Sequence, residues 1–215
     1  MRIKECWYES VCQNECSNSC LRYIEMKYLM DNSDIPPKRQ LPDKLVPESV
    51  DKPAFVQLNE IRLDVVNFVN SGENLYIWSN HTGNGKTSWA LKIMLRYFNE
   101  VWAGNGFRVR GKFVHVPTLL LKSKDFNNPL SQEYKNDIMN CDLVIFDDIA
   151  STGISQYDLS QLLLYIDHRS LYGKSTIYTG NLGFNDLHSA LGAKIASRVW
   201  SKDTNIIELK GADRR

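Results

Sequence analysis

The sequence has no long apolar run and almost no net charge. Its 215 residues contain no stretch of the length and apolarity needed for a transmembrane helix, and residues 1–6 contain no apolar segment of the signal-peptide kind. We therefore expect a cytoplasmic protein without membrane contacts. The 26 Lys and Arg nearly balance the 25 Asp and Glu, which gives a net charge of +1. Overall charge therefore does not predict nucleic-acid binding, which would have to depend on local patches.

Cysteine is scarce outside the first twenty residues, where four of the five cysteines lie. In a reducing compartment such clustering favours a metal site over disulfides, and four thiolates can hold one Zn²⁺ tetrahedrally. On a helix, three of these cysteines would share one face, and the helix would have to bend to bring them around one ion. An iron–sulfur cluster and a face of buried, apolar cysteines are the alternatives. The candidate zinc ligands are Cys6, Cys12, Cys16 and Cys20.

Proline is concentrated in residues 31–56, where it excludes a continuous helix. We predict that these residues form a linker, or an arm that lies along a neighbouring surface. They separate a cysteine-rich segment at 1–30, which contains a predicted helix at 21–30, from a globular core at 57–215. The prolines in question are Pro36, Pro37, Pro42, Pro47 and Pro53.

The core sequence alternates between strand and helix patterns. Predicted strands lie at residues 75–78, 113–116, 143–146, 175–181 and 205–211. Predicted helices lie at residues 58–69 and 89–98, from 117 onward, in a short stretch to about 139, and at 155–171, 184–191 and 193–200. Such alternation predicts an α/β fold with a five-stranded parallel sheet and helices on both faces.

Residues 79–85 form a glycine-bearing loop between the first strand and the next helix, which is typical of a phosphate site. Gly83 and Gly85 let backbone N–H groups approach anionic oxygens, while Lys86 and Thr87 would reach the terminal phosphates and Mg²⁺. The match to G-x-x-x-x-G-K-[ST] is imperfect because Asn80 replaces the first glycine; we expect Asn80 to turn left-handed in its place. A strand-to-helix turn without a ligand is the alternative. The predicted binding residues are Asn80, Gly83, Asn84, Gly85, Lys86, Thr87 and Ser88.

Polar side chains end two of the later strands. The apolar run at 143–146 leads into Asp147 and Asp148, and Asn181 ends the strand after it. Beside a phosphate loop, we expect Asp147 to bind Mg²⁺ and Asp148 to orient or deprotonate the attacking water. Asn181 would hold that water or contact the γ-phosphate. The alternative roles are a solvated acidic turn for the aspartates and a helix cap for Asn181.

Four segments taken together, 83–87, 143–148, 176–181 and 192–198, resemble the AAA+ ATPases that load replicative helicases, the DnaC and DnaI kind. The likeness covers about residues 35–215 and is strongest to the short versions encoded by bacteriophages. It implies ATP and Mg²⁺ as cofactors, with Lys86 and Thr87 as Walker A residues and the two aspartates as Walker B. It further implies Asn181 as sensor 1, Arg198 as an arginine finger and Arg214 as a sensor 2 arginine.

The resemblance also implies partners. The segment at 1–30 would bind a hexameric replicative DNA helicase, and ATP would drive assembly into a homo-oligomeric ring or helix that helps place the helicase on single-stranded DNA. Two departures, Asn80 and Asp148 where many AAA+ proteins carry glutamate, predict slow ATP hydrolysis, stimulated by single-stranded DNA. The candidate DNA contacts are Arg108, Arg110, Lys112, Lys122 and Lys124, with Phe107, Phe113 or Phe126 for stacking. Ordinary solvated charge is the alternative for each basic residue.

Three other functions share parts of this pattern. A transposase-helper AAA+ ATPase has the same core motifs. A P-loop nucleotide kinase has the phosphate loop, but it needs a lid with several arginines and does not need Asn181 and Arg198 at these spacings. An adaptor that binds ATP without hydrolysing it is consistent with Asn80 and Asp148.

Overall fold

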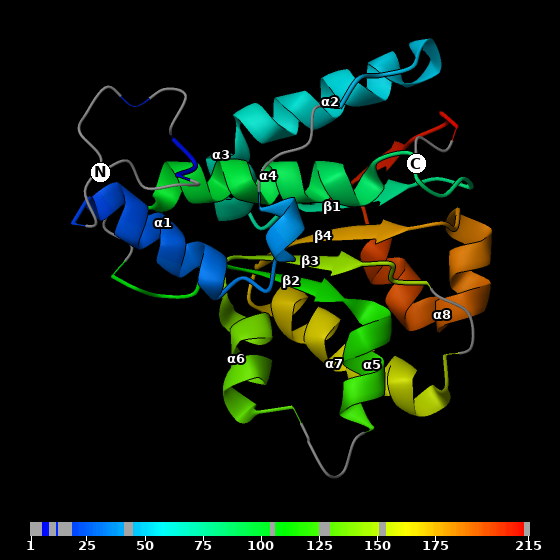
Figure 1. Cartoon of the computed structure of the whole chain (residues 1–215). Helices are drawn as coiled ribbons and strands as arrows, with labels where there is room; N and C mark the ends of the chain where they lie inside the picture. The colour runs from blue at the N-terminus through cyan, green and yellow to red at the C-terminus, as the bar shows by residue number, and fades with distance from the viewer. Residues whose placement is uncertain are drawn as a thin grey trace.

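The computed structural model describes residues 6–8, 12, 19–40, 45–103, 106–124, 130–150 and 154–212. Five parallel strands form one sheet in the order β2-β3-β4-β1-β5 (Figure 1). β3 and β4 are buried along their whole length, as expected for parallel strands covered on both faces. The strands are β1 (Asn74–Trp78), β2 (Gly111–His115), β3 (Leu143–Asp147), β4 (Ser175–Gly180) and β5 (Thr204–Glu208).

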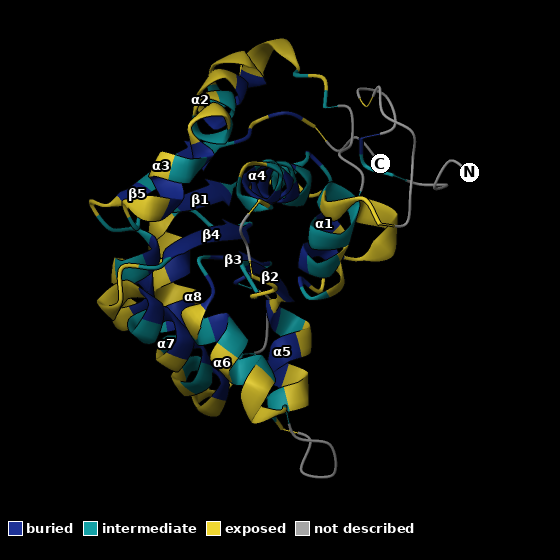
Figure 2. Cartoon of the chain, turned by 90° about the vertical axis from the view of Figure 1, so that its left-hand side faces the viewer, coloured by how far each residue is buried: buried dark blue, intermediate teal, exposed yellow. Residues whose placement is uncertain are grey.

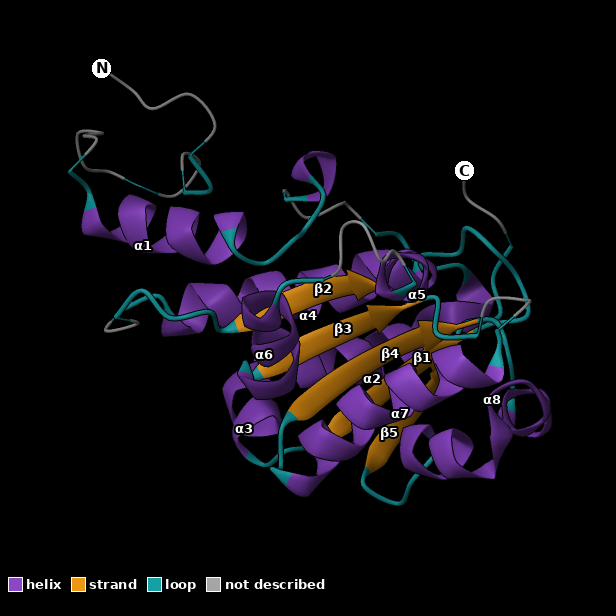
Figure 3. Cartoon of the chain, turned by 90° about the horizontal axis from the view of Figure 1, so that it is seen from below, coloured by secondary structure: helices purple, strands orange, loops and turns teal. Residues whose placement is uncertain are grey.

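Helices cover both faces of the sheet, as the sequence predicts (Figure 3). Successive strand residues point to opposite faces, so Leu75 and Ile77 join one apolar core and Tyr76 joins the other. The first core contains α1 (Leu21–Asp31), α2 (Lys52–Leu63), α3 (Val65–Asn70) and α4 (Lys86–Val101). The second contains α5 (Val116–Ser123), α6 (Gln132–Asn140), α7 (Gln156–Leu171) and α8 (Phe184–Val199). The short 3₁₀ helices are η1 (Pro37–Arg39) and η2 (Ser49–Asp51).

The predicted helix at 21–30 is confirmed as α1, which lies beside α4 (Figure 2). Its buried face holds Met26 and Leu29, and Arg22 donates a hydrogen bond to Asn99 on α4 (3.0 Å). The chain after α1 then runs along the edge of the sheet, where the Phe113 N–H of β2 donates to the Ser33 carbonyl (2.7 Å). The arm between α1 and α2 is therefore held against the core at its beginning.

Several element boundaries differ from the sequence prediction. The helix expected at 58–69 is two helices, α2 and α3, because the backbone leaves helical geometry at Asp64; α2 also begins earlier, with Pro53 in its first turn. Val116 starts α5 instead of ending β2. The two short helices expected at 184–191 and 193–200 correspond to α8, which kinks at Gly192 (φ 75°). Ser155 caps α7 as predicted.

The structure gives the zinc site no support. α1 begins only at Leu21, so Cys12 and Cys20 are not on a common helix, and both are exposed. They therefore form neither the helical metal face nor the buried cysteine face expected from the sequence. Cys6 is half-buried, and Cys16 lies outside the described residues. Within the described part of the chain, no three His, Cys, Asp or Glu side chains are placed to hold a metal ion.

Among the residues that the structure describes, no helix has both the length and the apolarity to cross a membrane.

Candidate functional site

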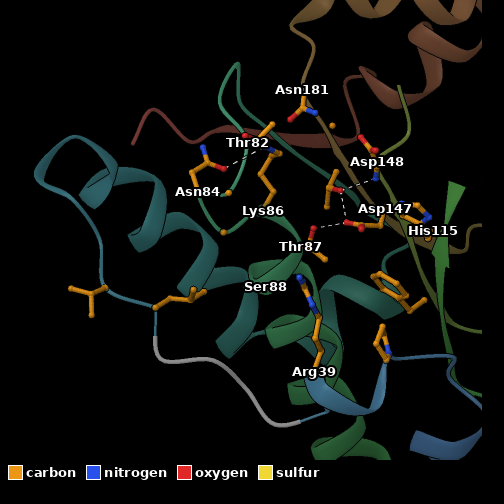
Figure 4. Close-up of a pocket in the computed structure, with 18 residues that line it drawn as sticks. Arg39, Thr82, Asn84, Lys86, Thr87, Ser88, His115, Asp147, Asp148 and Asn181 are labelled. Atoms are coloured by element: carbon orange, nitrogen blue, oxygen red, sulfur yellow. Dashed lines mark hydrogen bonds between the residues drawn. The ribbon is translucent and has the colours of Figure 1, made fainter. Parts of the chain in front are cut away.

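A cavity of about 870 Å³ lies at the carboxyl ends of the parallel strands (Figure 4). In open α/β sheets this is where ligands bind. Three of the predicted groups meet in it: the phosphate loop, the aspartates after β3 and the asparagine after β4. The arm before α2 closes a further side. The lining residues are Pro36, Arg39, Leu45, Val46, Thr82, Gly83, Asn84, Gly85, Lys86, Thr87, Ser88, Phe113, His115, Asp147, Asp148, Thr179, Gly180 and Asn181.

The loop between β1 and α4 closes through its glycines. Gly83 (φ 67°) and Gly85 (φ 103°) adopt the left-handed conformation, which a residue with a side chain enters only at a cost. Asn84 between them is fully buried, and its side-chain amide donates to Ser79 (2.6 Å) and to the Leu209 carbonyl after β5 (3.2 Å). The first bond closes the loop on itself, and the second joins it to the segment that follows β5.

Asn80 does not behave as the sequence predicts. Its φ is not positive, it is exposed, and it is not among the residues that line the cavity. Because the loop already reverses at Gly83 and Gly85, it needs no left-handed residue at position 80. The structure therefore gives no support to Asn80 as a contact to a bound phosphate.

The start of α4 supplies the groups that an anion needs. The first N–H groups of a helix have no partner within it, and the helix dipole adds partial positive charge at this end. Lys86, the first residue of α4, turns its ammonium back onto the loop, where it donates to the His81 carbonyl (2.7 Å) and to Asn84 Oδ1 (3.4 Å). A bound polyphosphate would offer that ammonium stronger, charged acceptors in place of these neutral oxygens.

Asp147 joins the phosphate loop to the neighbouring strands. Its Oδ1 accepts hydrogen bonds from the hydroxyls of Thr87 (2.7 Å) and Thr179 (2.7 Å), and its side chain is almost buried. A hydroxyl and a carboxylate oxygen held next to each other beside a phosphate loop form the donor set that Mg²⁺ uses with a nucleotide. Thr87 and Asp147 thus lie together as the sequence predicts, and they fit a magnesium ion.

Asp148 occupies a strained position beside them. Its φ of 58° is left-handed, which costs a residue other than glycine about 1 kcal/mol. The turn is held because the Asp148 N–H donates to the Thr179 hydroxyl (3.1 Å) and the Ile149 N–H donates to the Thr179 carbonyl (2.9 Å). The strain is retained at a residue that lines the cavity, where Figure 4 shows Asp148 and Asn181 near the phosphate loop.

Asn181 presents an unused acceptor. Its Oδ1 is buried and, among the described residues, no donor reaches it. The backbone next to Asn181 is held by a hydrogen bond from the Tyr76 hydroxyl to the Leu182 carbonyl (2.8 Å). Burial raises the pKa of Tyr76, which keeps this donor protonated. A Cβ at position 180 would come within 2.6 Å of the same hydroxyl, so a side chain there would displace that hydroxyl from its position. An amide oxygen held in this way can accept a hydrogen bond from a water molecule in the cavity.

Of the two predicted arginines, Arg198 lies outside this cavity. Arg198, near the end of α8, forms an ion pair with Asp167 on α7 and donates to the Lys194 carbonyl (2.9 Å). It lines a different, polar cavity of about 490 Å³ together with residues that precede β1 and β5. Arg214 lies outside the described residues. Arg198 therefore does not reach the phosphate loop of its own chain.

Most of the residues predicted to contact DNA are buried or form ion pairs within the chain. Lys112 is buried and binds Asp34 (2.8 Å), and Phe113 is buried in the core, so the prediction is wrong for these two residues. Three more of the candidate residues form ion pairs: Arg108 and Arg110 share Asp142, and Lys124 binds Asp158. Lys122 and Phe107 are exposed, while Phe126 lies outside the described residues.

Two residues of the site were not found by sequence reasoning. Thr179 is the second partner of Asp147, and its signal is weak: it lies in β4, two residues before Asn181. Arg39 lines the cavity from η1, in the arm that the sequence places outside the core. No local pattern marks Arg39, because the arm reaches the cavity only through tertiary packing.

The fold is similar to those of several solved replication proteins. The structure of the DnaC helicase loader aligns with a TM-score of 0.67 and 21% sequence identity, over 81% of this chain and 100% of the DnaC chain. DnaI aligns with a TM-score of 0.65 and 20% identity, over 85% of this chain and 95% of its own. The replication initiator DnaA, bound to AMPPCP and single-stranded DNA, aligns with a TM-score of 0.63 and 16% identity, over 85% of this chain and 53% of its own.

These likenesses confirm the predicted fold class, a five-stranded parallel sheet of the AAA+ P-loop type with helices on both faces. No protein-family model and no curated protein sequence matches the chain.

Proposed function

We propose that this chain is an ATP-dependent helicase loader. It binds a hexameric replicative DNA helicase of a bacterial host and helps place it on single-stranded DNA, with ATP binding and hydrolysis controlling assembly and release. The observation that carries the proposal is the hydrogen bond from Thr87 to Asp147 (2.7 Å), which joins the phosphate loop to the acidic strand end inside one cavity. The similarity in fold to DnaC and DnaI supports the loader role.

Different residues of the cavity have different roles in ATP hydrolysis. The loop and the first turn of α4 bind the phosphates, and Lys86 exchanges the His81 carbonyl for a phosphate oxygen. Thr87 and Asp147 would hold Mg²⁺, which would supply positive charge to the phosphates. Asp148 and Asn181 orient the attacking water. The Asp148 side chain is one methylene shorter than glutamate, so we expect slow turnover.

Arg198 acts as an arginine finger on the nucleotide of the next subunit. Arg198 lines a different cavity from its own phosphate loop, which supports a role on a neighbouring subunit. A contact that forms only between subunits would make tight ATP binding depend on assembly. Repeated head-to-tail contact builds a ring or an open helix. Arg198→Ala and Lys86→Ala proteins should each be inactive and should regain ATPase activity when mixed. If mixing restores no activity, the finger does not act across subunits.

Calorimetry with ATP and Mg²⁺ tests the nucleotide site. The unmodified chain should bind ATP, and Lys86→Ala should bind it about a hundredfold more weakly, because the ammonium–phosphate contact is lost. Lys122→Ala is the matched control, since Lys122 is exposed on α5 and does not line the cavity. ATP binding that is absent from the unmodified chain, or unchanged in Lys86→Ala, would contradict the proposal.

Transfer of helicase onto DNA tests the loader role. The full chain is mixed with each of a panel of purified bacterial replicative helicases and with single-stranded DNA, and DNA-bound helicase is measured with and without ATP. We expect one helicase to form a complex and to gain ATP-dependent DNA association that Lys86→Ala fails to support. A kinase is less consistent with the cavity, because Arg39 is the one arginine among its described lining residues. Phosphoryl transfer to a nucleoside monophosphate would favour the kinase instead.

A further inference from the structure

Arg39 is a cation in the candidate nucleotide cavity that the phosphate-loop pattern does not include. It is the last residue of η1, it is exposed, and its side chain points toward Ser88 in the first turn of α4 (Figure 4). Within the described part of the chain, no hydrogen bond or ion pair occupies its guanidinium. A planar fork of donors beside the phosphate-binding end of a helix is suited to a phosphate, which it can bind through two parallel hydrogen bonds.

The backbone before Arg39 is anchored, so the position of the side chain is not accidental. Ser33 is fully buried and its carbonyl accepts the Phe113 N–H of β2 (2.7 Å), while the buried side chain of Ile35 belongs to the same core as α4. Between them Asp34 binds the ammonium of Lys112 (2.8 Å). These contacts hold residues 33–35 against the edge of the sheet and direct the following turn over the cavity.

The same short segment leads directly into α1. The Ser33 hydroxyl donates to the Met30 carbonyl in the last turn of the helix (2.8 Å), and five residues lie between Ser33 and Arg39. Met30 itself is buried. A ligand that binds Arg39 would therefore add a second attachment to this segment: residues 33–35 are already held at the sheet edge next to α1, and Arg39 would be held beside the first turn of α4.

The charge balance of the cavity favours such a contact. Among its described lining residues, Lys86 and Arg39 are the lysine and the arginine, His115 is the one histidine, and Asp147 and Asp148 are the acidic side chains. Both aspartates are assigned to Mg²⁺ and water in the proposed function, so the polyphosphate depends on the two cations and on backbone N–H groups. Lys86 would contact the phosphates from the phosphate loop, and Arg39 would contact them from the arm.

We propose that Arg39 binds the phosphates of the nucleotide and thereby fastens the arm at residues 33–40, with α1, to the phosphate loop. This inference rests on the proposed function, because it requires a nucleotide in this cavity. It also adds a form of regulation: nucleotide occupancy sets how firmly the N-terminal segment, the proposed helicase contact, is held to the ATPase core.

The test compares Arg39→Ala with Lys38→Ala, its neighbour on the same 3₁₀ turn, which is exposed and does not line the cavity. Calorimetry with ATP and Mg²⁺ should show about tenfold weaker binding for Arg39→Ala and no change for Lys38→Ala. Arg39→Lys should fall between them, since it keeps the charge and loses the fork. Amide hydrogen exchange supplies a second measurement: ATP should slow exchange at residues 33–40 in the unmodified chain and in Lys38→Ala, but not in Arg39→Ala.

The outcomes separate this inference from the function beneath it. If the unmodified chain binds no ATP, both are overturned. If it binds ATP and Lys86→Ala does not, while Arg39→Ala binds as tightly as Lys38→Ala, only the inference is overturned. Equal ATP-dependent protection of residues 33–40 in Arg39→Ala and Lys38→Ala would also overturn it. Thermal unfolding of each variant confirms that the chain is folded, which we expect because both side chains are exposed.

Discussion

Each end of the β-sheet contains a buried polar group, but the one at the amino end has its hydrogen bonds complete and the one at the carboxyl end has an unused acceptor. At the amino end, the fully buried Arg169 of α7 donates to the carbonyls of Ile138 (2.8 Å), Cys141 (2.9 Å) and Ser175, and to the Thr176 hydroxyl (3.0 Å). At the carboxyl end, the buried Oδ1 of Asn181 has no partner among the described residues.

This difference indicates that the amino end of the sheet stabilises the fold and that the carboxyl end binds ligand. A saturated network in a low-dielectric interior holds elements together and has no capacity left for a ligand. An unsatisfied buried acceptor costs free energy, and it is retained where a ligand or water completes it. The strained Asp148 and the open cavity lie at the unsaturated end, as does the Thr87–Asp147 pair. Variants at the two ends should therefore differ in kind: stability should change at one end and turnover at the other.

The largest effect is expected from Arg169→Met. Several buried carbonyls would lose their donor at once, so the free energy of unfolding should fall by about 3 kcal/mol or more. Chemical denaturation measures it. Arg96→Met is the control, because Arg96 forms a half-exposed ion pair with Glu100 on α4 and its loss should cost less than about 1 kcal/mol. Equal losses for the two variants would show that the buried network does not support the fold.

Asp147→Asn should affect the other end almost as strongly, but in activity. The substitution keeps the size of the side chain and removes the charge that would hold Mg²⁺, so ATP turnover should fall about a hundredfold or more. The free energy of unfolding should change by no more than about 1 kcal/mol, since the amide oxygen can still accept both hydroxyls. Steady-state ATPase assays over a range of Mg²⁺ concentrations measure the change, with Asp203→Asn on the surface as control. Unimpaired turnover would remove Asp147 from the metal site.

Asn181→Ala is expected to have a smaller effect that is confined to the chemical step. Loss of the amide oxygen should lower turnover about tenfold because one water-orienting contact disappears. ATP affinity should stay within about twofold, because the phosphates are bound by the loop and α4. Parallel measurement of turnover and ATP affinity separates the two quantities. A variant that loses affinity and keeps its turnover would place Asn181 among the phosphate contacts.

The smallest effects come from a matched pair of tyrosines, one at each end. The Tyr76 hydroxyl supports the turn that carries Asn181, whereas the Tyr97 hydroxyl donates to Asp142 at the amino end (2.9 Å). Tyr76→Phe and Tyr97→Phe should each lower the free energy of unfolding by about 1 kcal/mol. Only Tyr76→Phe should also lower turnover, about threefold, because it loosens the backbone beside Asn181. If both variants, or neither, change turnover, the two ends are not functionally distinct.

The phosphate loop could be predicted from the sequence because its parts are contiguous. Gly83, Gly85, Lys86 and Thr87 follow one another, and a strand and a helix on either side constrain their geometry. The acidic strand end was predictable for a similar reason, since a short apolar run identifies a buried strand and carboxyl ends of parallel strands meet at one edge of the sheet. The fold class follows from the same alternation of strand and helix patterns.

The errors concern residues whose environment depends on distant segments. Lys112 and Phe113 look like exposed DNA contacts in the sequence, but the arm docks against β2, so Lys112 pairs with Asp34, and the Phe113 side chain is buried in the first core. Asn80 was expected to reverse the chain, yet two glycines further along do so. Local propensity does not reveal which of several possible residues will bear a turn, or which surface an arm will cover.

The sequence alone determined the order of strands and helices along the chain and the phosphate loop with its charged and hydroxyl side chains. These features depend on neighbours within a few residues. Tertiary structure alone decided that Thr179 shares Asp147 with Thr87, that Asn84 is hydrogen-bonded to Leu209, and that Arg39 lines the same cavity as the first turn of α4. Those contacts join segments far apart in the chain, and they exist only once the helices have packed on both faces of the sheet.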